Sequence, residues 1–572
     1  MKKSFSREFS DFIGNSKKIF IYSFIFSAFM NVLYLASPVY MTIIYDRVMT
    51  SKSVETLLFV TIALFLAYAT YAVLEAVRGR LVAHLSDAME KSLADAIIGA
   101  VLSRNTAGTA PRSGSQATRD LDVIRQFTAG PGTIAALDLP WAPFYVVVLF
   151  TIHPYLGAFA LFACVTQFAL AVLIEKAGRQ RVAEAAKSAA RSYQVGEAIS
   201  RQADTVRTMG LASGLSAKWS AARSDMIEEQ LKGSRPVIVL SAMSKFSSLF
   251  FASAALGVGA LLAIDNLVSP GAVFAASLLL GRAMQPLQQA MASWKGFLTA
   301  RESLANLNQL LLSADVGTRD KMTLPQPKGL LTVEGVSWRP PGETKAVLSN
   351  VNLALPAGSM TCIVGPSGGG KSTLARLCAG AMSPTVGIVR LDGADLVHWG
   401  DQQLGKAIGY LPQEVALFPG SVKENLCRFS DMPDEDVLKA SSLSGADEVI
   451  NQLPEGYQTI LSDDARNISG GQRQRIGLAR AVIGAPCVVI LDEPNANLDT
   501  VGEAALARCL AQLKGRGTTT IIVSHKMNLV QASDYVVVVS GGMASAPTPA
   551  KTFIEQQMAA VRAAGSPGAQ VA

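Results

Sequence analysis

The chain has 572 residues, of which 50% are hydrophobic and only 17% are charged, and its mean hydropathy is +0.30. This length allows about two to four domains, and the hydropathy excludes a wholly soluble enzyme. The net charge of +7 does not indicate nucleic-acid binding, because Lys and Arg are concentrated between apolar segments, as the positive-inside rule expects. The six cysteines form no C-x-x-C pair and are predicted to be small buried side chains in a reducing compartment.

Six apolar segments predict membrane-spanning helices, since about 20 such residues cross a hydrocarbon core of about 30 Å. They lie at 19–45, 56–74, 139–152, 155–174, 237–264 and 271–290. The third is the weakest because LPWAP places two prolines at its start, and it forms a helical hairpin with the fourth across His153–Pro154. The first span is too long for a signal-peptide core and is predicted to be retained.

Charged residues set the predicted orientation. Five basic residues precede the first span and place the N-terminus in the cytoplasm: Lys2, Lys3, Arg7, Lys17 and Lys18. The connections at 75–129 and 175–235 are long, basic and amphipathic, and we expect them to be helical extensions of the spans. With six spans, both termini then lie in the cytoplasm.

These patterns divide the chain into a transmembrane domain at 1–312, a linker at 313–329 that contains LPQPKG, a nucleotide-binding domain at 330–560 and a flexible tail at 561–572. After Gly541 the chain is rich in Ala, Gly, Pro and Ser, which predicts one short helix and a frayed end.

The sequence GPSGGGKST matches a phosphate-binding loop. A buried strand is predicted at 360–364 before the loop, and a helix at 371–378 is predicted to point its N-terminus at the phosphates. Lys371 reaches the β- and γ-phosphates of ATP, and the hydroxyl of Ser372 ligates Mg²⁺. The residues predicted to hold ATP here are Gly365, Pro366, Ser367, Gly368, Gly369, Gly370, Lys371, Ser372 and Thr373.

A second predicted strand, VVIL, ends in two carboxylates. Asp492 suits a role at Mg²⁺, and Glu493 is placed to polarise the attacking water. His525 follows the predicted strand TTTIIVS and, in this order of motifs, is predicted to contact the γ-phosphate. Taken alone, His525 could equally be an ordinary residue at the end of a strand.

Further motifs resemble those of ATP-binding cassette (ABC) proteins. Ser469, Gly470, Gly471 and Gln472, followed by RQR, resemble the signature; Gln413 in YLPQ resembles the glutamine that contacts Mg²⁺ and nucleotide, and Asp499 in NLD belongs to a D-loop-like sequence. The resemblance implies a six-helix, all-α transmembrane domain of the type I exporter kind followed by an α/β ATPase domain. It also implies a homodimer in which the phosphate loop of one chain and the signature of the other enclose each ATP.

A narrower resemblance is to the ATPases of type I secretion that export proteases, lipases and repeat-in-toxin proteins. It is carried by SPVYMTIIYDRV, DLPWAPFYVVVLFTIHPYLG, GRAMQPLQQ, LPQPKG and DEPNANLD. It implies a lipid-embedded protein of the bacterial inner membrane, without an N-terminal peptidase-like domain. Its implied partners are a periplasmic membrane-fusion protein, a TolC-like outer-membrane channel and an unfolded protein substrate with an uncleaved C-terminal signal.

Three positions depart from the family pattern. Ile468 stands where the signature usually has leucine, a nearly isosteric change. Pro340 replaces the aromatic residue expected to stack on adenine two positions after Trp338, which is itself predicted to be a core residue. The segment SDDARN lacks the glycine-rich, glutamate-bearing sequence common before the signature of exporters.

Other classes share parts of this pattern. A multidrug or lipid exporter has the same cassette motifs and remains the alternative. A soluble ABC ATPase does not account for the six spans. An ATP-gated channel or regulatory membrane ATPase would tolerate a degenerate catalytic site, whereas Glu493 and His525 are both present.

Arg282 is the most anomalous residue of the membrane half. It lies about 11 residues, or about 16 Å, into the sixth span, where a guanidinium is costly unless it faces protein, water or a partner. It either pairs with a carboxylate or carbonyl groups between helices or lines a translocation path for an acidic cargo. Lys245, in contrast, is predicted to lie near the inner interface and to reach water without a functional role.

Overall fold

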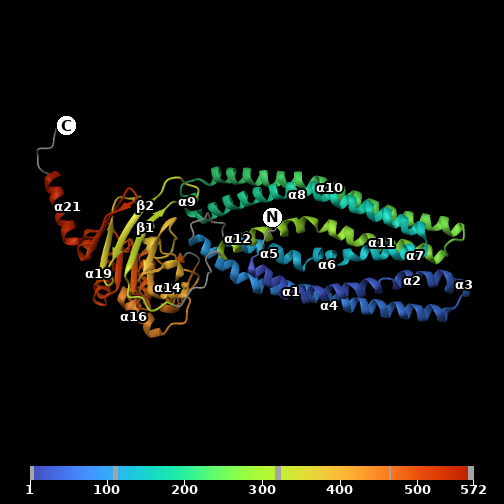
Figure 1. Ribbon diagram of the computed structural model, residues 1–572, viewed down its shortest axis with the longest axis horizontal. Helices are drawn as coiled ribbons and strands as arrows, with labels where there is room; N and C mark the ends of the chain where they lie inside the picture. Colours follow the sequence, from blue (N-terminus) through green and yellow to red (C-terminus); the bar gives the residue numbers. More distant parts are fainter. Residues whose placement is uncertain (1–5, 107–113, 316–323, 463–464, 565–572) are drawn as a thin grey trace. The chain divides into compact units, whose positions relative to one another are not determined.

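The computed structural model describes residues 6–106, 114–315, 324–462 and 465–564 (Figure 1). The chain divides into two units, residues 1–101 with 112–313 and residues 102–111 with 314–572. Five features of the sequence analysis lie outside the described residues, wholly or in part: Lys2 and Lys3, residues 107–113 of the connection at 75–129, residues 316–323 of the linker, residues 463–464 of SDDARN and residues 565–572 of the tail.

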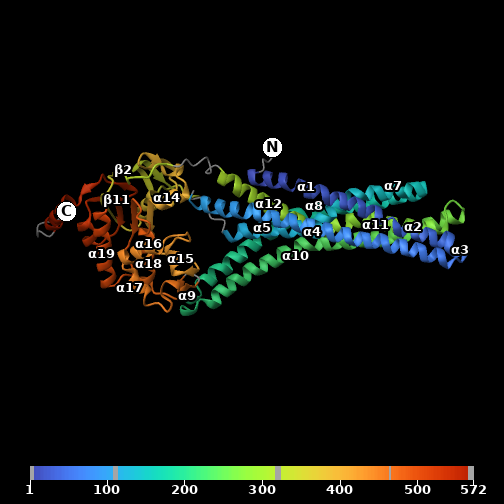
Figure 2. The same cartoon turned by 90° about the horizontal axis from the view of Figure 1, so that it is seen from below.

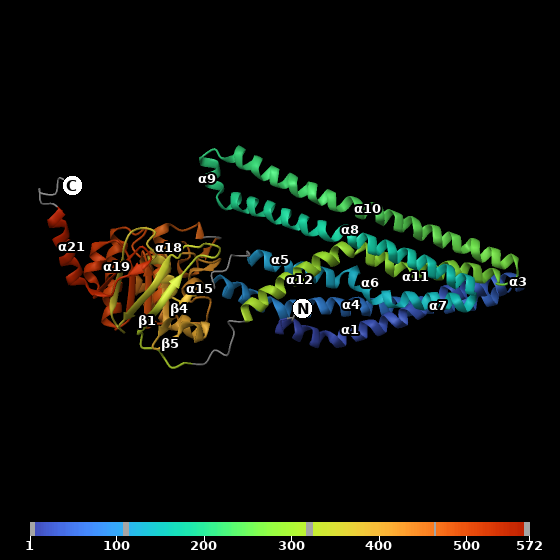
Figure 3. The same cartoon turned by 45° about the horizontal axis from the view of Figure 1, so that its top comes forward.

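The first unit is helical and contains three very long helices, α4 (Val54–Thr106), α8 (Pro154–Arg201) and α10 (Ala212–Ile264). In Figures 1 and 2, α8 and α10 lie side by side, and Figure 3 shows the short α9 (Ala203–Thr208) joining their ends. Since α4 and α8 continue well beyond the second and fourth predicted spans, the helical extensions are confirmed. The other helices are α1 (Arg7–Leu33), α2 (Ala36–Ile43), the π-helix η1 (Ile44–Val48), α3 (Met49–Ser51), α5 (Gly114–Ala129), α6 (Pro131–Asp138), the 3₁₀ turn η2 (Leu139–Trp141), α7 (Ala142–Ile152), α11 (Pro270–Ala292) and α12 (Trp294–Asp315).

Proline interrupts two of the predicted spans. The first predicted span lies within one apolar helical stretch, Phe9–Ser51, but the helix is interrupted there, because α1 ends at Leu33 and α2 begins at Ala36. Pro38 has no amide hydrogen to bond the carbonyl of Tyr34, so the helix cannot continue regularly through this point. In the third span, Pro140 and Pro143 accompany the change from η2 to α7.

Within the described part of the chain, five helical stretches are long and apolar enough to cross a membrane: Phe9–Ser51, Val54–Ser103, Pro131–Ile152, Pro154–Ala177 and Ala212–Ile264. The sixth predicted span, α11, is not among them. It carries Arg282 and several glutamines, yet much of its surface is buried against α2, α7, α8 and α10. A helix enclosed by other helices needs less apolar surface than one that faces lipid, and six spans therefore remain a prediction.

Several buried polar groups of this unit are paired across helices. The guanidinium of Arg78 on α4 donates to Asp138 of α6 at 2.8 Å, and the hydroxyl of Ser27 on α1 also donates to Asp138. Gln167 of α8 and Ser244 of α10 exchange two hydrogen bonds, of 2.9 and 2.7 Å. Because an unpaired polar group is costly in an apolar interior, these pairs fix which faces of the helices meet.

The N-terminus of α11 is held by the π-helix. The carboxylate of Asp46 accepts a hydrogen bond of 2.8 Å from the backbone nitrogen of Gly271 and another from the hydroxyl of Ser269. The rings of Tyr45 and Phe274 stack beside it with centroids 4.3 Å apart. A side chain at Gly271 would meet the backbone of Thr42, so glycine permits the close approach of α2 and α11.

The second unit is built on a sheet with a parallel centre. Its path is β12 (Met543–Ala544), β11 (Tyr535–Ser540), β3 (Met360–Val364), β10 (Thr519–Val523), β9 (Val488–Asp492) and β6 (Ile408–Leu411), and β13 (Thr548–Pro549) pairs with β11. The strands from β11 to β6 are parallel. A second, antiparallel sheet contains β2 (Leu348–Leu355), β1 (Leu331–Trp338), β4 (Val386–Leu391) and β5 (Ala394–Asp395), and β7 (Gly420–Ser421) pairs with β8 (Ile460–Leu461).

Helices surround these sheets: α13 (Lys371–Cys378), η3 (Leu396–His398), α14 (Asp401–Ala407), α15 (Val422–Leu426), α16 (Asp434–Ser444), α17 (Ala446–Ile450), η4 (Gly456–Gln458), α18 (Gly470–Val482), α19 (Thr500–Gly515), α20 (Met527–Ala532) and α21 (Ala550–Ala564). The predicted helix after Gly541 is α21. The short strands β12 and β13 of the same segment were not predicted.

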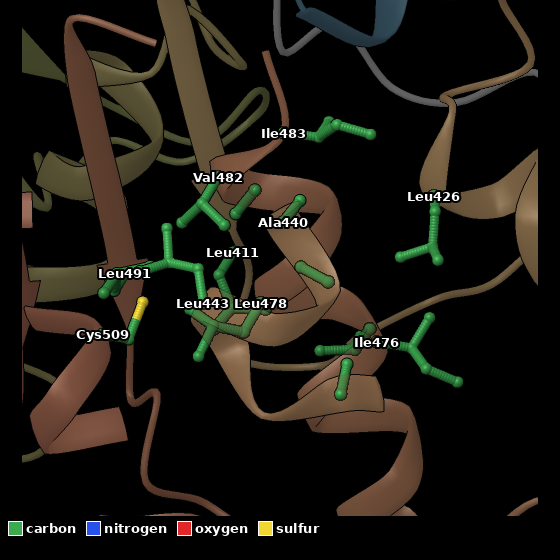
Figure 4. Packing of buried hydrophobic residues seen from close by; sticks show 14 of the residues in the cluster. Leu411, Leu426, Ala440, Leu443, Ile476, Leu478, Val482, Ile483, Leu491 and Cys509 are labelled. Atoms are coloured by element: carbon green, nitrogen blue, oxygen red, sulfur yellow. The ribbon is translucent and has the colours of Figure 1, made fainter. Parts of the chain in front are cut away.

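Two apolar cores cover the two faces of the parallel sheet. In Figure 4, Leu411 and Leu491 from the sheet lie among Leu443, Leu478 and Cys509 from α16, α18 and α19. Alternate residues of β9 belong to the opposite core, together with α13 and the antiparallel sheet, as the alternation of side chains along a strand requires. This double burial explains why β3, β9 and β10 carry apolar residues on both faces.

The cysteines and Trp338 occupy the apolar environments predicted for them, with some exposure. Cys362, Cys378, Cys427 and Cys509 are buried, whereas Cys164 and Cys487 are half-buried, and all six are free thiols. Trp338 is half-buried and packs against the core between the sheets.

Candidate nucleotide-binding site

The ends of four parallel strands bring the predicted catalytic groups to one edge of the sheet. The phosphate loop follows β3, Gln413 follows β6, Asp492 and Glu493 end β9, and His525 follows β10. The register pairs Asp492 with Val523, Val523 with Ile363 and Leu411 with Leu491, so these strands end at nearly the same level. The carboxyl edge of such a sheet is the usual place of ligand sites.

Glycine shapes the phosphate loop because its backbone is left-handed at several positions. Gly365, Gly368 and Gly370 have φ of 151°, 76° and 100°, and a side chain at Gly365 would collide with the carbonyl of Val539. The loop leads directly into α13, whose free N–H groups favour an anion. The ammonium of Lys371 donates to the carbonyls of Gly365 and Pro366, at 2.9 Å each, and so lies within the loop.

The pair Ser372 and Asp492 fits a divalent cation. The Ser372 hydroxyl donates to Oδ1 of Asp492 at 3.1 Å. Asp492 is fully buried, and its Oδ2 has no hydrogen-bond partner among the described residues. Burial raises the pKa of this carboxyl group, so a cation at the free oxygen would stabilise the charged form. Hydroxyl and carboxylate oxygens are the ligands that Mg²⁺ prefers.

Glu493 and His525 form a second pair at the same edge. Oε1 of Glu493 lies 3.6 Å from Nε2 of His525, and the side chains are 20% and 55% exposed. Burial raises the pKa of the Glu493 carboxyl, and the neighbouring His525 acts in the opposite direction. A carboxylate with a raised pKa is better suited to accept a proton from water.

The backbone holds Glu493 in an unusual conformation. Its φ is 49°, in the left-handed region, and its amide donates to the carbonyl of Val523 at 2.9 Å. The buried side chain of Gln474 donates to the carbonyl of Pro494 at 3.3 Å. The left-handed backbone of Glu493 is strained, and a conformation of this kind persists only where the surrounding contacts hold it.

The signature residues lie at the N-terminus of α18. Ser469 caps the helix, and it forms a capping box with Gln472 through hydrogen bonds of 3.2 and 2.8 Å. The backbone of Gly471 faces the carbonyl of Asn497, and a side chain there would come within 2.9 Å of it. Gly470 and Ser469 are exposed. Among the described residues, no hydrogen bond joins this end of α18 to the phosphate loop of the same chain.

Asp499 connects α18 to α19. Its carboxylate accepts hydrogen bonds from the backbone nitrogen of Gly502 and from Arg475, each of 2.8 Å. These two donors lower the pKa of Asp499. The roles of Arg475 and Gln474 were not predicted, although both belong to the RQR sequence that follows the signature.

The three departures from the family pattern have different structural settings. Ile468 is buried in the core around α18, consistent with a nearly isosteric replacement of leucine. Pro340 offers no aromatic ring for adenine. SDDARN lies partly outside the described residues and is not characterised further.

Comparison with known proteins decides the family. Residues 20–287 match the family model described as ABC transporter transmembrane region, and residues 348–496 match the ABC transporter model. The type I secretion system ATP-binding protein PrsD of Rhizobium meliloti (strain 1021) is 35% identical over 93% of this chain and 91% of its own length. The chain belongs to the ABC transporters of type I secretion.

More distant similarities agree with this assignment. The toxin RTX-I translocation ATP-binding protein of Actinobacillus pleuropneumoniae and the alpha-hemolysin translocation ATP-binding protein HlyB of Escherichia coli are each 27% identical over 92% of this chain and 75% of their own lengths. A bacterial Atm1-family ABC exporter solved with ATP bound has the same fold, with a TM-score of 0.80, 19% identity and coverage of 97% and 99% of the two chains. This ABC transporter is thus a multi-pass membrane protein that binds ATP and couples its hydrolysis to transport.

Replacement of Glu493 by glutamine tests the assignment of the catalytic carboxylate. Glu493→Gln keeps the shape of the side chain but cannot accept a proton, so turnover of ATP is expected to fall by about 10²-fold or more while ATP still binds. Lys371→Ala, which removes the cation of the phosphate loop, is expected to weaken nucleotide binding instead. Both are measured on the purified transporter by ATPase rate and by titration with a fluorescent ATP analogue; hydrolysis by Glu493→Gln at the wild-type rate would exclude the assigned role.

Proposed function

We propose that this transporter is a homodimer of the bacterial inner membrane that exports an unfolded protein with an uncleaved C-terminal signal. The observation that carries the proposal is the 35% identity to a type I secretion ATP-binding protein over nearly the whole of both chains, because it includes the helices that would form a path as well as the ATPase. The membrane-fusion protein and the TolC-like channel are the proposed partners. In this arrangement the ATPase domain and both termini face the cytoplasm.

The site geometry supports a dimer with shared ATP sites. The phosphate loop lies at the carboxyl edge of the sheet, whereas the signature end of α18 is exposed and has no hydrogen bond to that loop among the described residues. An ATP held by the loop therefore has room for a signature supplied by a second chain. Glycines at 470 and 471 would let that backbone approach the phosphates closely.

Within each site we assign roles by position. The phosphate loop and Lys371 hold the phosphates, and Ser372, Asp492 and Gln413 hold Mg²⁺, which neutralises charge on the phosphates. Glu493 orients and deprotonates the attacking water, with its carboxylate already biased toward accepting a proton by burial. His525 contacts the γ-phosphate and lies close enough to Glu493 to orient it.

Protein export is tested with the transporter in proteoliposomes. The probes are an unfolded calcium-repeat protein with its C-terminal signal and the same protein without that segment. We expect the complete protein alone to stimulate ATP hydrolysis, because the signal is what the transporter recognises. Equal rates with both proteins, or stimulation only by lipids or small hydrophobic compounds, would favour a lipid or multidrug exporter instead.

Arg282 is the residue that we propose to contact the cargo in the membrane half. It is half-buried on α11, its Cζ lies 3.2 Å from the centroid of the Tyr34 ring, and it donates to the side-chain oxygen of Gln285. Among the described residues, it has no carboxylate or backbone carbonyl partner. A guanidinium held by an aromatic face keeps its positive charge available, which would suit an acidic, unfolded chain.

Variants of Arg282 separate this role from a structural one. Arg282→Ala and Arg282→Lys are expected to reduce secretion and substrate-stimulated ATP hydrolysis by about tenfold or more, with basal hydrolysis and assembly nearly unchanged. The matched control is Lys245→Ala, which removes an exposed cation from α10 and is expected to leave secretion normal. Loss of folded protein in both Arg282 variants would make the residue structural, and normal secretion by Arg282→Ala would remove it from transport.

A further inference from the structure

Two arginines of the ATPase domain face backbone carbonyls in place of acidic partners. Arg428 donates to the carbonyl of Arg480 from Nε at 3.0 Å and from Nη2 at 2.9 Å, and Nη2 also donates to Ala481 at 3.2 Å. Its Nη1 donates to the carbonyl of Gly405. Among the described residues, neither Arg428 nor Arg480 has a carboxylate partner.

The acceptors of Arg428 lie at the ends of two helices. Arg480 and Ala481 belong to the last turn of α18, and Gly405 to the last turn of α14. The final carbonyls of a helix lack partners within it and carry partial negative charge. One guanidinium thus stabilises the C-terminal ends of α14, which leads into β6, and of α18, which begins at the signature.

Arg480 completes the connection from the other side. Its Nη2 donates to the carbonyl of Ala416 at 2.9 Å, three residues after Gln413. The side chain of Arg480 therefore joins the end of α18 to the chain just after Gln413. The side chain of Arg428 joins the same end of α18, through its carbonyls, to the chain at residue 428. Hydrogen bonds of the two arginines thus attach both ends of the segment 413–428 to the end of α18.

That segment is internally fixed. The buried side chain of Asn425 accepts from the backbone nitrogen of Phe418 at 2.9 Å and donates to the carbonyls of Phe418 and Ser421 at 2.8 and 3.1 Å. Ser421 and Glu424 form a capping box at the start of α15. These hydrogen bonds would transmit a displacement of Gln413 along the segment to Arg428.

Two features show that holding Arg428 in place is costly to the fold. Arg428 and Phe429 both have φ of 54°, in the left-handed region, although neither is glycine. Burial lowers the pKa of both arginines from its ordinary value, and no described carboxylate offsets this. Both arginine side chains are half-buried, and a strained backbone of this kind persists where the surrounding structure fixes it.

We propose that Arg428 is a positioning residue for ATP hydrolysis, which keeps the signature helix α18 and the segment after Gln413 moving as one body. The proposal rests on the roles proposed above for Gln413 at Mg²⁺ and for the signature at ATP. When Gln413 follows the bound nucleotide, α18 follows as well and presents Ser469 and the signature glycines to the second site. Arginine is required because its planar fork reaches carbonyls of two helices, which a single ammonium cannot do.

The test is steady-state ATP hydrolysis by the full-length transporter in proteoliposomes. Arg428→Met is expected to lower kcat by about tenfold or more and to leave KM for ATP within about twofold, because the phosphate loop and Lys371 are not touched. Arg428→Lys is expected to recover part of kcat. The control is Arg390→Met, which removes a guanidinium that pairs with Glu334 at 3.2 Å in the antiparallel sheet, and its kinetics are expected to match the wild type.

Arg480→Met is the second variant and breaks the contact with Ala416 from the other side. The same loss of kcat at constant KM is expected for Arg480→Met. If Arg428→Met does not fold, the kinetics of Arg480→Met test the proposal in its place. The proposal is overturned if the folded variants keep kcat within twofold of the wild type, or if kcat and KM change in parallel. The export proposal is refuted separately, if the wild-type transporter hydrolyses ATP but is not stimulated by the signal-bearing protein. The comparison of basal kcat and KM between the arginine variants and the wild type would still test the role of Arg428.

Discussion

The buried carboxylate of Asp492 is the constraint on which the ATPase half depends. It ends a strand that is buried on both faces, one oxygen accepts from Ser372, and the other faces no described donor. A charge in this position is unfavourable until a cation reaches it. The same strand end fixes Glu493, and the parallel register brings the phosphate loop, Gln413 and His525 to the same edge. A bound Mg²⁺ would supply the positive charge that the fold leaves unmatched at Asp492, and through it would hold the anionic phosphates at the same edge.

In the membrane half, buried polar groups determine how the helices pack. Apolar helices in lipid associate through van der Waals packing and hydrogen bonds between helices, and an unpaired polar group in the apolar interior is costly. Arg78 with Asp138, and Gln167 with Ser244, each join two helices, and Asp46 holds the start of α11. Arg282 differs from these, because its partners among the described residues are an aromatic ring and a side-chain amide. This difference is why we connect it with cargo rather than with packing.

Much of the ATPase site could be predicted from the sequence because its signals are local. The strand Met360–Val364 and the helix Lys371–Cys378 have the predicted bounds, since an apolar run and a glycine-rich loop define both ends. The interruption between Leu33 and Ala36 has a local signal in Pro38, which the prediction of the first span did not use. The π-helix and the enclosure of α11 could not be predicted in this way, because they depend on packing against distant helices. The contacts of Arg428 and Arg480 were also missed, since hydrogen bonds to backbone carbonyls leave no pattern in the sequence.

The central claim is that each ATP site is built from two chains. It is tested most directly by ATPase activity of a purified mixed dimer in which one chain carries Lys371→Ala and the other Ser469→Arg. Each variant alone is expected to be inactive. In the mixed dimer one site carries both changes and the other carries neither, so the account predicts recovery of a substantial part of the activity, up to about half. Complete absence of recovery in a stable mixed dimer would contradict shared sites that turn over independently.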